Sequence, residues 1–232
     1  MRRHSALAMI AVLALAGVAS AQDSRPGIAV AVWENGGSYG QDAEDFAALG
    51  VGLQQMLMNE FAENGALRMV DRSQLKTLMD EQDLGASGRM DESTAARIGK
   101  IVGARYFIMG SFIDWYGDMQ LVARIVNTET SELVTVSRAR GEREELFSLV
   151  VQLAQGITED LSLPALPRQV QQEREERAER IPHEAVRLYT KALLYADRGD
   201  NDRAIELFSR ITQDFPQYTE AGEALEQLRS GT

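Results

Sequence analysis

The stretch that decides the fold reads Ala95-Ala96-Arg97-Ile98-Gly99-Lys100-Ile101-Val102-Gly103-Ala104-Arg105-Tyr106-Phe107-Ile108-Met109-Gly110-Ser111. Ala95, Ile98 and Ile101 recur at three-residue steps, which is the spacing of one helix face. Gly103 follows directly and is expected to end the helix, as a glycine just past the last turn commonly does. Residues 104–113 are dense in Tyr, Phe, Ile and Met, which is typical of a strand. We therefore expect Asp91 to cap a helix that runs through Val102 and leads directly into a buried strand.

Upstream of this stretch, the pattern predicts two strands and two helices. Residues 28–33 and 67–70 read as strands, the first because it is short, apolar and partly β-branched. A helix over 72–82 places Leu75, Leu78 and Met79 inward. A long helix is expected over 41–64, because its apolar residues recur at three- and four-residue steps: Phe46, Leu49, Leu53, Met56, Leu57 and Phe61.

Downstream, two further strands are expected at 119–126 and 133–136, and an amphipathic helix closes the unit over 142–161. The inward residues of that helix are Leu146, Val150, Leu153 and Ile157. The fold class predicted for residues 22–163 is therefore mixed α/β (α+β): one sheet of four or five strands with packed helices.

The first 21 residues have the pattern of a secretory signal peptide. Arg2 and Arg3 give a positive start, 5–18 is uncharged and apolar, and Ala19-Ser20-Ala21 provides an A-x-A cleavage site. The apolar run is shorter than the roughly 20 residues of a membrane-spanning helix. We expect cleavage after Ala21 and a periplasmic location. The net charge of −11 would then become −13.

The end of the chain differs in character from its first two thirds. Residues 164–181 begin with prolines, which break a helix, and continue almost wholly charged or amide-bearing. Glu173 and Arg177 lie four residues apart, as do Glu176 and Arg180, so this linker is expected to be a solvated helix.

Residues 182–232 resemble one tetratricopeptide repeat of 34 residues, followed by a capping helix. The small and large residues that carry the resemblance are Leu188, Ala192, Tyr195, Ala204 and Phe208, with Gly199 and Pro216 as helix ends. One repeat is too small to be stable alone, so the unit is expected to pack on the first domain, the linker or another subunit. If the hairpin has a binding groove, Tyr189, Leu193 and Ala196 face it; the alternative is a purely structural hairpin.

A family resemblance is carried by the opening stretch together with a second one upstream. This second stretch reads Val70-Asp71-Arg72-Ser73-Gln74-Leu75, then Met79-Asp80-Glu81-Gln82-Asp83-Leu84, then Gly88. Together they resemble the CsgG family, the curli production assembly/transport component. Arg124-Ile125-Val126-Asn127 and Thr130-Ser131-Glu132-Leu133 are similar to the family's later hairpin, although Asn127 and Ser131 replace its usual Asp and Gly. The resemblance spans residues 28–161.

The resemblance implies a component of cell-envelope protein assembly or transport that acts by protein–protein contacts and forms homo-oligomers. Channel-forming members of the family are lipid-anchored outer-membrane rings. This chain has no cysteine to acylate, so we expect no lipid anchor and a periplasmic relative, with association to the outer membrane left open. Two alternatives remain: an adaptor or activator of another envelope complex, such as a cell-wall synthase, and a small-ligand receptor that uses the loop 36–40.

The residue content argues against catalysis and cofactors. The absence of cysteine excludes disulfides, zinc–thiolate sites, iron–sulfur clusters and thiol nucleophiles. Outside the leader the only histidine is His183, which we expect to be solvated near a helix start. The acidic balance disfavours nucleic acid, whose binding depends on Lys and Arg. We therefore predict no enzyme activity, no metal and no cofactor, and envelope or secretion proteins as partners.

Overall fold

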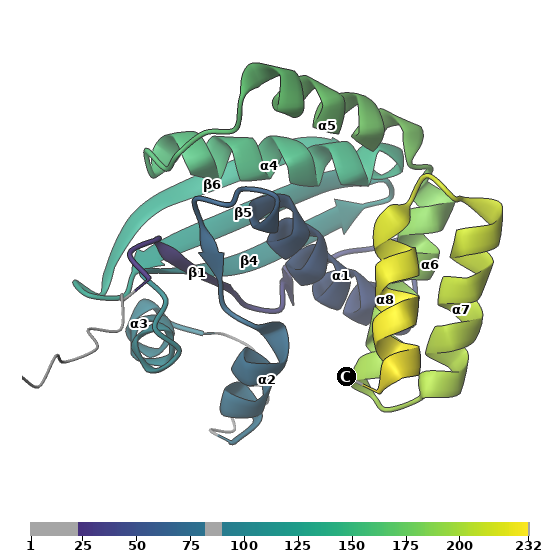
Figure 1. Ribbon diagram of the computed structural model, residues 1–232, viewed down its shortest axis with the longest axis horizontal. Helices are drawn as coiled ribbons and strands as arrows, with labels where there is room; N and C mark the ends of the chain where they lie inside the picture. The colour runs from purple at the N-terminus through teal and green to yellow at the C-terminus, as the bar shows by residue number, and fades with distance from the viewer. Residues whose placement is uncertain (1–22, 82–89, 232) are drawn as a thin grey trace, which may run out of the picture.

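A mixed β-sheet forms the middle layer of the computed structural model, which describes residues 23–81 and 90–231 (Figure 1). The predicted signal peptide and residues 82–89 therefore lie outside the described residues. Within them the sheet has six strands in the order β3-β1-β4-β5-β6, with β2 beside β4. The strands are β1 (Gly27–Val30), β2 (Glu34–Asn35), β3 (Arg68–Met69), β4 (Tyr106–Trp115), β5 (Asp118–Asn127) and β6 (Glu132–Glu142). β1 runs parallel to β3 and β4, and β4, β5 and β6 are antiparallel.

Helices cover both faces of the sheet, which confirms the predicted fold class. On one face lie α1 (Ala43–Ala62) and α4 (Leu146–Asp160), and on the other α2 (Arg72–Glu81) and α3 (Glu92–Ile101). The residues of β1 alternate between these layers: Ile28 and Val30 pack with α1, whereas Ala29 and Ala31 pack with α3. The inward residues predicted for the helices over 41–64 and 142–161 are all buried.

The decisive stretch folds as predicted except at one residue. Asp91 caps α3 by accepting the backbone N–H of Thr94, and Gly103 ends it with a positive φ of 69°. Gly99 lies directly against Thr128, where a Cβ would collide with that side chain. Ile101 was expected to face inward, but its side chain is 56% exposed. The Ile98 face is the one that meets the sheet, and Ile101 turns away from it at the last helical residue.

The sheet has six strands and not the expected four or five, because the short β2 was not predicted, and two strand boundaries differ from the prediction by three residues or more. The first strand ends at Val30, because Trp33 turns inward and its N–H bonds to the carbonyl of Gly50 in α1. The last strand, β6, is much longer than the predicted 133–136 and runs to Glu142. A 3-10 turn (Arg143–Glu145) then precedes α4, and Arg143 forms an ion pair with the buried Asp114 of β4. This contact between distant residues holds the end of β6 in the sheet.

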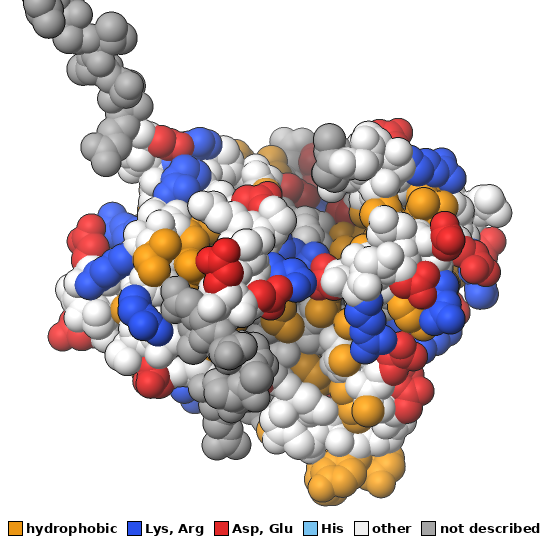
Figure 2. Space-filling model, turned by 90° about the horizontal axis from the view of Figure 1, so that it is seen from below, with side chains coloured by type: hydrophobic (Ala, Val, Ile, Leu, Met, Phe, Trp, Pro, Cys, Tyr) orange, Lys and Arg blue, Asp and Glu red, His pale blue; other side chains and the backbone are white. Residues whose placement is uncertain are grey.

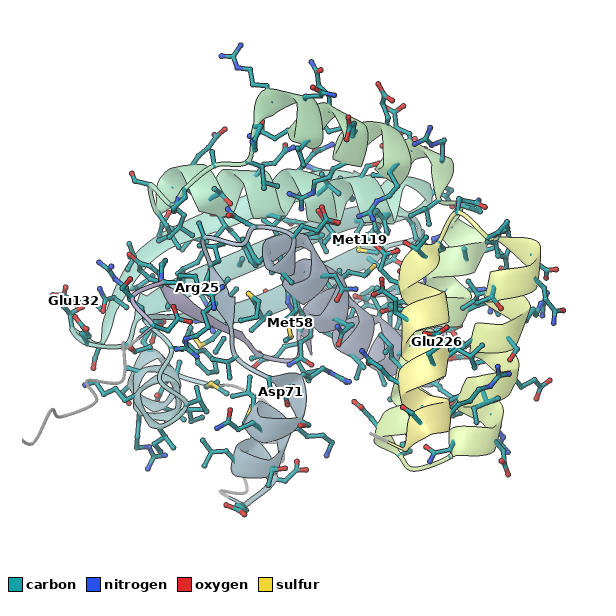
Figure 3. All side chains as sticks on the ribbon, viewed as in Figure 1. Arg25, Met58, Asp71, Met119, Glu132 and Glu226 are labelled. Carbon is teal, nitrogen blue, oxygen red and sulfur yellow. The ribbon has the colours of Figure 1, made fainter. Side chains whose placement is uncertain are left out.

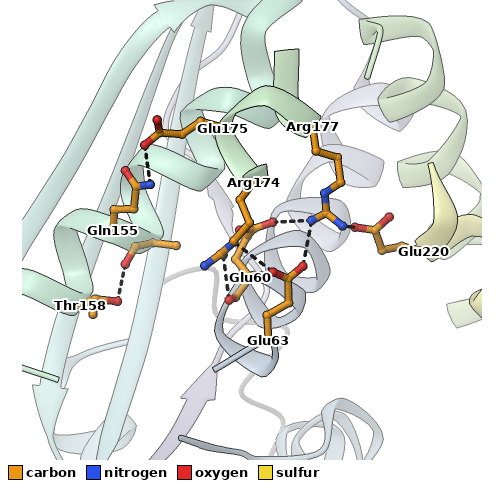
Figure 4. A network of polar contacts seen from close by, with 9 residues as sticks. Glu60, Glu63, Gln155, Thr158, Arg174, Glu175, Arg177 and Glu220 are labelled. Atoms are coloured by element: carbon orange, nitrogen blue, oxygen red, sulfur yellow. Dashed lines mark hydrogen bonds and ion pairs between the residues drawn. The ribbon is translucent and has the colours of Figure 1, made fainter. Parts of the chain in front are cut away.

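The charged linker forms a helix, α5 (Arg168–Arg180), but one of its faces is buried (Figure 4). Arg174 forms an ion pair with the buried Glu60 of α1, and burial lowers the pKa of Arg174 to about 10. Arg177 lies 3.0 Å from Glu63 and 3.2 Å from Glu220. The prediction of a fully solvated helix is therefore wrong for this linker. Two of its arginines, Arg174 and Arg177, form ion pairs with glutamates that are distant in sequence. These ion pairs connect α5 to α1 and to α8 (Thr219–Ser230).

The C-terminal unit is a helical hairpin with one further helix: α6 (His183–Asp197), α7 (Asn201–Asp214) and α8 (Thr219–Ser230). It packs on α1, where Gly52 lies against Thr190 of α6. Two ion pairs support this joint: Lys191 with Asp45, and Arg198 with Glu44. The buried apolar cluster of the sheet, α1 and α4 continues into α6, α7 and α8. The expected packing on the first domain is therefore observed.

A candidate protein-binding hollow

An open hollow of about 730 Å³ lies where the sheet domain meets the C-terminal hairpin. Helices α1 and α2 form one side and α6 and α8 the other. Figure 2 looks into it from below the view of Figure 1, and shows hydrophobic side chains on its floor and charged ones around its rim. This volume is within the range of protein binding pockets, roughly 300–1,000 Å³. We call it the interhelical hollow.

One wall is a single stripe of α8. The residues that line it lie at steps of three, four, seven and eight from the first, which places them on one helix face: Glu220, Glu223, Ala224, Gln227 and Leu228. The neighbouring face of α8, with Ala221 and Leu225, is buried in the core. Ala224 and Leu228 are partly buried against that core, so this wall of the hollow is mixed, with three polar and two apolar residues.

The facing wall comes from α1 and the start of α2. On α1, Gln55, Met58 and Asn59 again share one helix face. At the start of α2, Asp71 caps the helix by accepting the backbone N–H groups of Ser73 and Gln74. The hydrogen bond from the Ser73 hydroxyl lowers the pKa of Asp71, which is therefore ionised. Figure 3 labels Met58 and Asp71 on this wall, and Glu226 on α8.

The three site residues predicted from sequence all line the hollow, on α6. Ala196 is half-buried, Leu193 is buried and Tyr189 is only 2% exposed. The Tyr189 ring contacts those of Phe208 and Tyr218, with centroids 5.7 and 4.8 Å apart, and burial raises the pKa of its hydroxyl. Tyr189 is thus part of the floor, and Ala196 is the more accessible of the three.

Helical periodicity could not identify the other two walls. It shows which residues of α6 share a face, but not that α2 and α8 stand opposite that face. The i, i+3, i+4, i+7 spacing on α8 was present in the sequence, and it was the available signal for that wall. The α2 wall depends on tertiary packing over more than a hundred residues, as in the ion pair of Arg72 with Asp197.

Most charges around the hollow are already paired within the chain. Arg72 pairs with Asp197 across α2 and α6, Lys76 with Asp80 along α2, and Glu220 with Arg177 of α5. Glu223 is exposed and has no ion-pair partner among the described residues. The hollow thus presents an apolar floor, compensated charges and, on α8, one carboxylate without a counter-charge.

The other candidate sites are less open. In the loop 36–40, the N–H groups of Gly36 and Tyr39 bond to β4 carbonyls, and those of Gly37 and Ser38 bond to the Asn35 side chain. These four donors are therefore not available to an anion. His183 begins α6, as expected, but it is half-buried, and burial lowers its pKa.

Across 23–81 and 90–231, no three His, Asp or Glu side chains are grouped so that they could hold a metal ion. In the same residues, no helix is both long and apolar enough to cross a membrane.

Comparison with solved structures finds similarity to LpoB and PelC, among others. The LpoB C-terminal domain from Escherichia coli is 23% identical, with 53% of this chain and 87% of that chain covered and a TM-score of 0.40. The same domain from Salmonella enterica is 22% identical, with 53% of this chain and 87% of that chain covered and a TM-score of 0.38. The PelC dodecamer from Paraburkholderia phytofirmans is 13% identical, with 62% of this chain and 91% of that chain covered and a TM-score of 0.37.

Comparison with protein families and curated proteins completes these findings. None of the curated proteins compared matches this chain. The family model described as "Curli production assembly/transport component CsgG" matches residues 14–117. This match includes the decisive stretch and ends just before β5, so it stops short of the predicted limit at residue 161 and does not include the C-terminal helices. The sequence resemblance to the CsgG family is confirmed for residues 14–117.

Proposed function

We propose that this chain is a non-enzymatic component of the cell envelope that works by binding other proteins. The family match over 14–117 supports an envelope role through protein interaction. The leader pattern of residues 1–21 supports delivery to the periplasm. Assembly or transport of envelope proteins, as in curli production, is the specific role we favour, and activation of another envelope complex is the alternative.

The interhelical hollow is the observation that carries the binding role. It is formed jointly by the CsgG-like part, through α1 and α2, and by the hairpin, through α6 and α8. A hairpin that served only to cover α1 would need the α6 face that packs there, whereas α8 also lines the hollow, with Ala224 and Leu228 half-buried against the core and Glu223 and Gln227 exposed. A concave site with an apolar floor and a few polar groups at its rim is typical of a binding site.

The test is site-specific photocrosslinking in cells that produce the full chain. A photoreactive residue is placed at one of three exposed positions: Gln227 in the hollow, Arg138 on β6, or Glu206 on α7. We expect one defined envelope protein to be captured from Gln227, and only background from Glu206. Identification of a secretion component supports the assembly role, whereas a peptidoglycan enzyme supports the alternative. Background-level capture from all three positions would contradict the proposal.

A further inference from the structure

We propose that the interhelical hollow receives one amphipathic helix of the partner, apolar toward the floor and basic toward α8. This inference rests on the proposed function, because it specifies the chemistry of the bound protein segment. It concerns α6 and α8, which lie outside the residues matched by the family model, together with the part of α1 and α2 that faces them.

The walls have the form that packs against a helix. The residues of the α8 stripe recur at steps of three and four in the sequence, and so do Gln55, Met58 and Asn59 of α1. Side chains at such steps form ridges on a helix surface, and helices pack by fitting the ridges of one into the grooves of the other. A helix with its side chains is about 10–12 Å across, so 730 Å³ corresponds to roughly one to two helical turns. The hollow is open to solvent at one side, as Figure 2 shows, so a longer helix can continue beyond it.

The polar groups of the hollow favour a helix over a small polar ligand or an extended peptide. Arg72 and Asp197 satisfy one another, and Asp71 is occupied by the first turn of α2. These charged groups are therefore already engaged within the chain. A helix needs few polar partners, because its backbone hydrogen bonds are made internally. Its apolar side chains can instead contact Met58, Leu193 and Leu228, as in other helix-in-groove complexes.

The charge at the rim of the hollow favours a basic flank on the bound helix. Glu223 extends from α8 at the hollow without a counter-ion among the described residues, and the ionised Asp71 lies on the facing wall. The two bases that line the hollow, Arg72 and Lys76, already have acidic partners. A Lys or Arg on the bound helix would gain an ion pair with Glu223, whereas a Glu would be repelled by it.

The test uses three synthetic 18-residue helical peptides with the same leucine stripe and with Lys, Gln or Glu on the flanks. Their binding to the chain from residue 22 onward is measured by fluorescence anisotropy. We expect the Lys peptide to bind at least fivefold more tightly than the Gln peptide, and the Glu peptide to bind most weakly. The proposal is overturned if the three bind equally, or if none binds.

Two pairs of variants separate the hollow from the general negative charge of the protein. Glu223→Lys should weaken the Lys peptide about fivefold or more, whereas Glu226→Lys, an equal charge change at an exposed α8 residue outside the hollow, should not. Gln227→Trp should obstruct the hollow and weaken all binding, whereas Gln213→Trp on α7 should not. Circular dichroism confirms that each variant is folded. Equal effects within either pair would overturn the inference.

The two proposals can fail separately. Capture of an envelope protein from Arg138 on β6, with no peptide binding in the hollow, would leave the proposed function standing and refute the helix. Conversely, the Lys peptide could bind tightly and lose this binding in Glu223→Lys while no envelope partner is crosslinked. That result would refute the proposed function and retain the hollow as a helix site.

Discussion

At the scale of single residues, the joint between the sheet domain and the hairpin depends on a missing side chain. Gly52 lies in the middle of α1, and a Cβ at this position would collide with the Thr190 methyl group of α6. Glycine costs a helix about 0.5–1 kcal/mol relative to alanine, so its presence here is unfavourable for α1 alone. The close approach of α6 to α1 is the gain that offsets this cost.

We therefore expect Gly52→Ala to lower the free energy of unfolding by about 1–2 kcal/mol, because overpacking a buried contact costs more than the helix gains. Gly156→Ala is the matched control: Gly156 is also inside a helix, α4, but its Cβ would meet nothing within 4 Å. This control should stabilise by about 0.5–1 kcal/mol. Both values are measured by urea unfolding followed by circular dichroism.

A second substitution tests the cause. Thr190→Ser removes the methyl group that the new Cβ would strike and keeps the hydroxyl that donates to the Arg187 carbonyl. Added to Gly52→Ala, it should restore only part of the lost stability, because the Thr190 Cβ also lies within 3.0 Å of the new Cβ position. A Gly52→Ala variant as stable as the Gly156→Ala control would show that α6 does not press on α1 at this point.

At the scale of elements, the sequence predicted what depends on local pattern. The long helix α1, the cap at Asp91 and the stop at Gly103 follow from spacing and residue type, and each is observed. The errors arise where a distant residue decides the outcome. β6 extends to Glu142 because it pairs along its whole length with β5, although 137–142 lack strong strand residues.

The residues that line the hollow show the same difference between local and long-range features. Tyr189, Leu193 and Ala196 were predicted because they share one face of α6, which is a local property. The α8 wall and the start of α2 were not predicted, because nothing in a single sequence states which helix stands opposite another. The charged segment α5 is the clearest case. Its sequence is typical of a solvated helix, yet Arg174 is buried because Glu60 of α1 lies next to it.

The Arg174–Glu60 pair gives a prediction at this scale. Arg174→Met should lower the free energy of unfolding by about 3–5 kcal/mol, because it leaves the buried Glu60 carboxylate with only the more distant Arg177, 3.4 Å away. Arg140→Met is the control: Arg140 forms an ion pair with Asp118 in which both side chains are largely exposed, and its loss should cost less than about 1 kcal/mol. Urea unfolding measures both.

The double variant Arg174→Met/Glu60→Leu distinguishes a lost pair from lost packing. It removes both charges together, so it should recover much of the stability that Arg174→Met loses. If the double variant is no more stable than the single one, the cost came from the packing of the arginine stem between α5 and α1 and not from the stranded carboxylate.

At the scale of the whole molecule, the predicted division at residue 182 is a change of sequence character that does not interrupt the buried core. Leu53 and Leu57 of α1, Leu153 of α4 and Leu188 of α6 belong to the same buried cluster. The hairpin thus covers a face of α1 that would otherwise be exposed to water, and the walls of the hollow are held at a fixed distance by the same packing.

If this core is shared, the sheet and the hairpin must unfold together. Both tryptophans, Trp33 and Trp115, lie in the sheet domain, whereas α6, α7 and α8 contribute a large part of the helix content and contain no tryptophan. In urea, tryptophan fluorescence therefore reports on the sheet, and far-ultraviolet circular dichroism reports on the hairpin as well. We expect the two transitions to have the same midpoint, as a two-state unfolding requires. A circular dichroism transition at lower urea would show that the hairpin separates first, and the hollow would then be a joint that opens, not a preformed site.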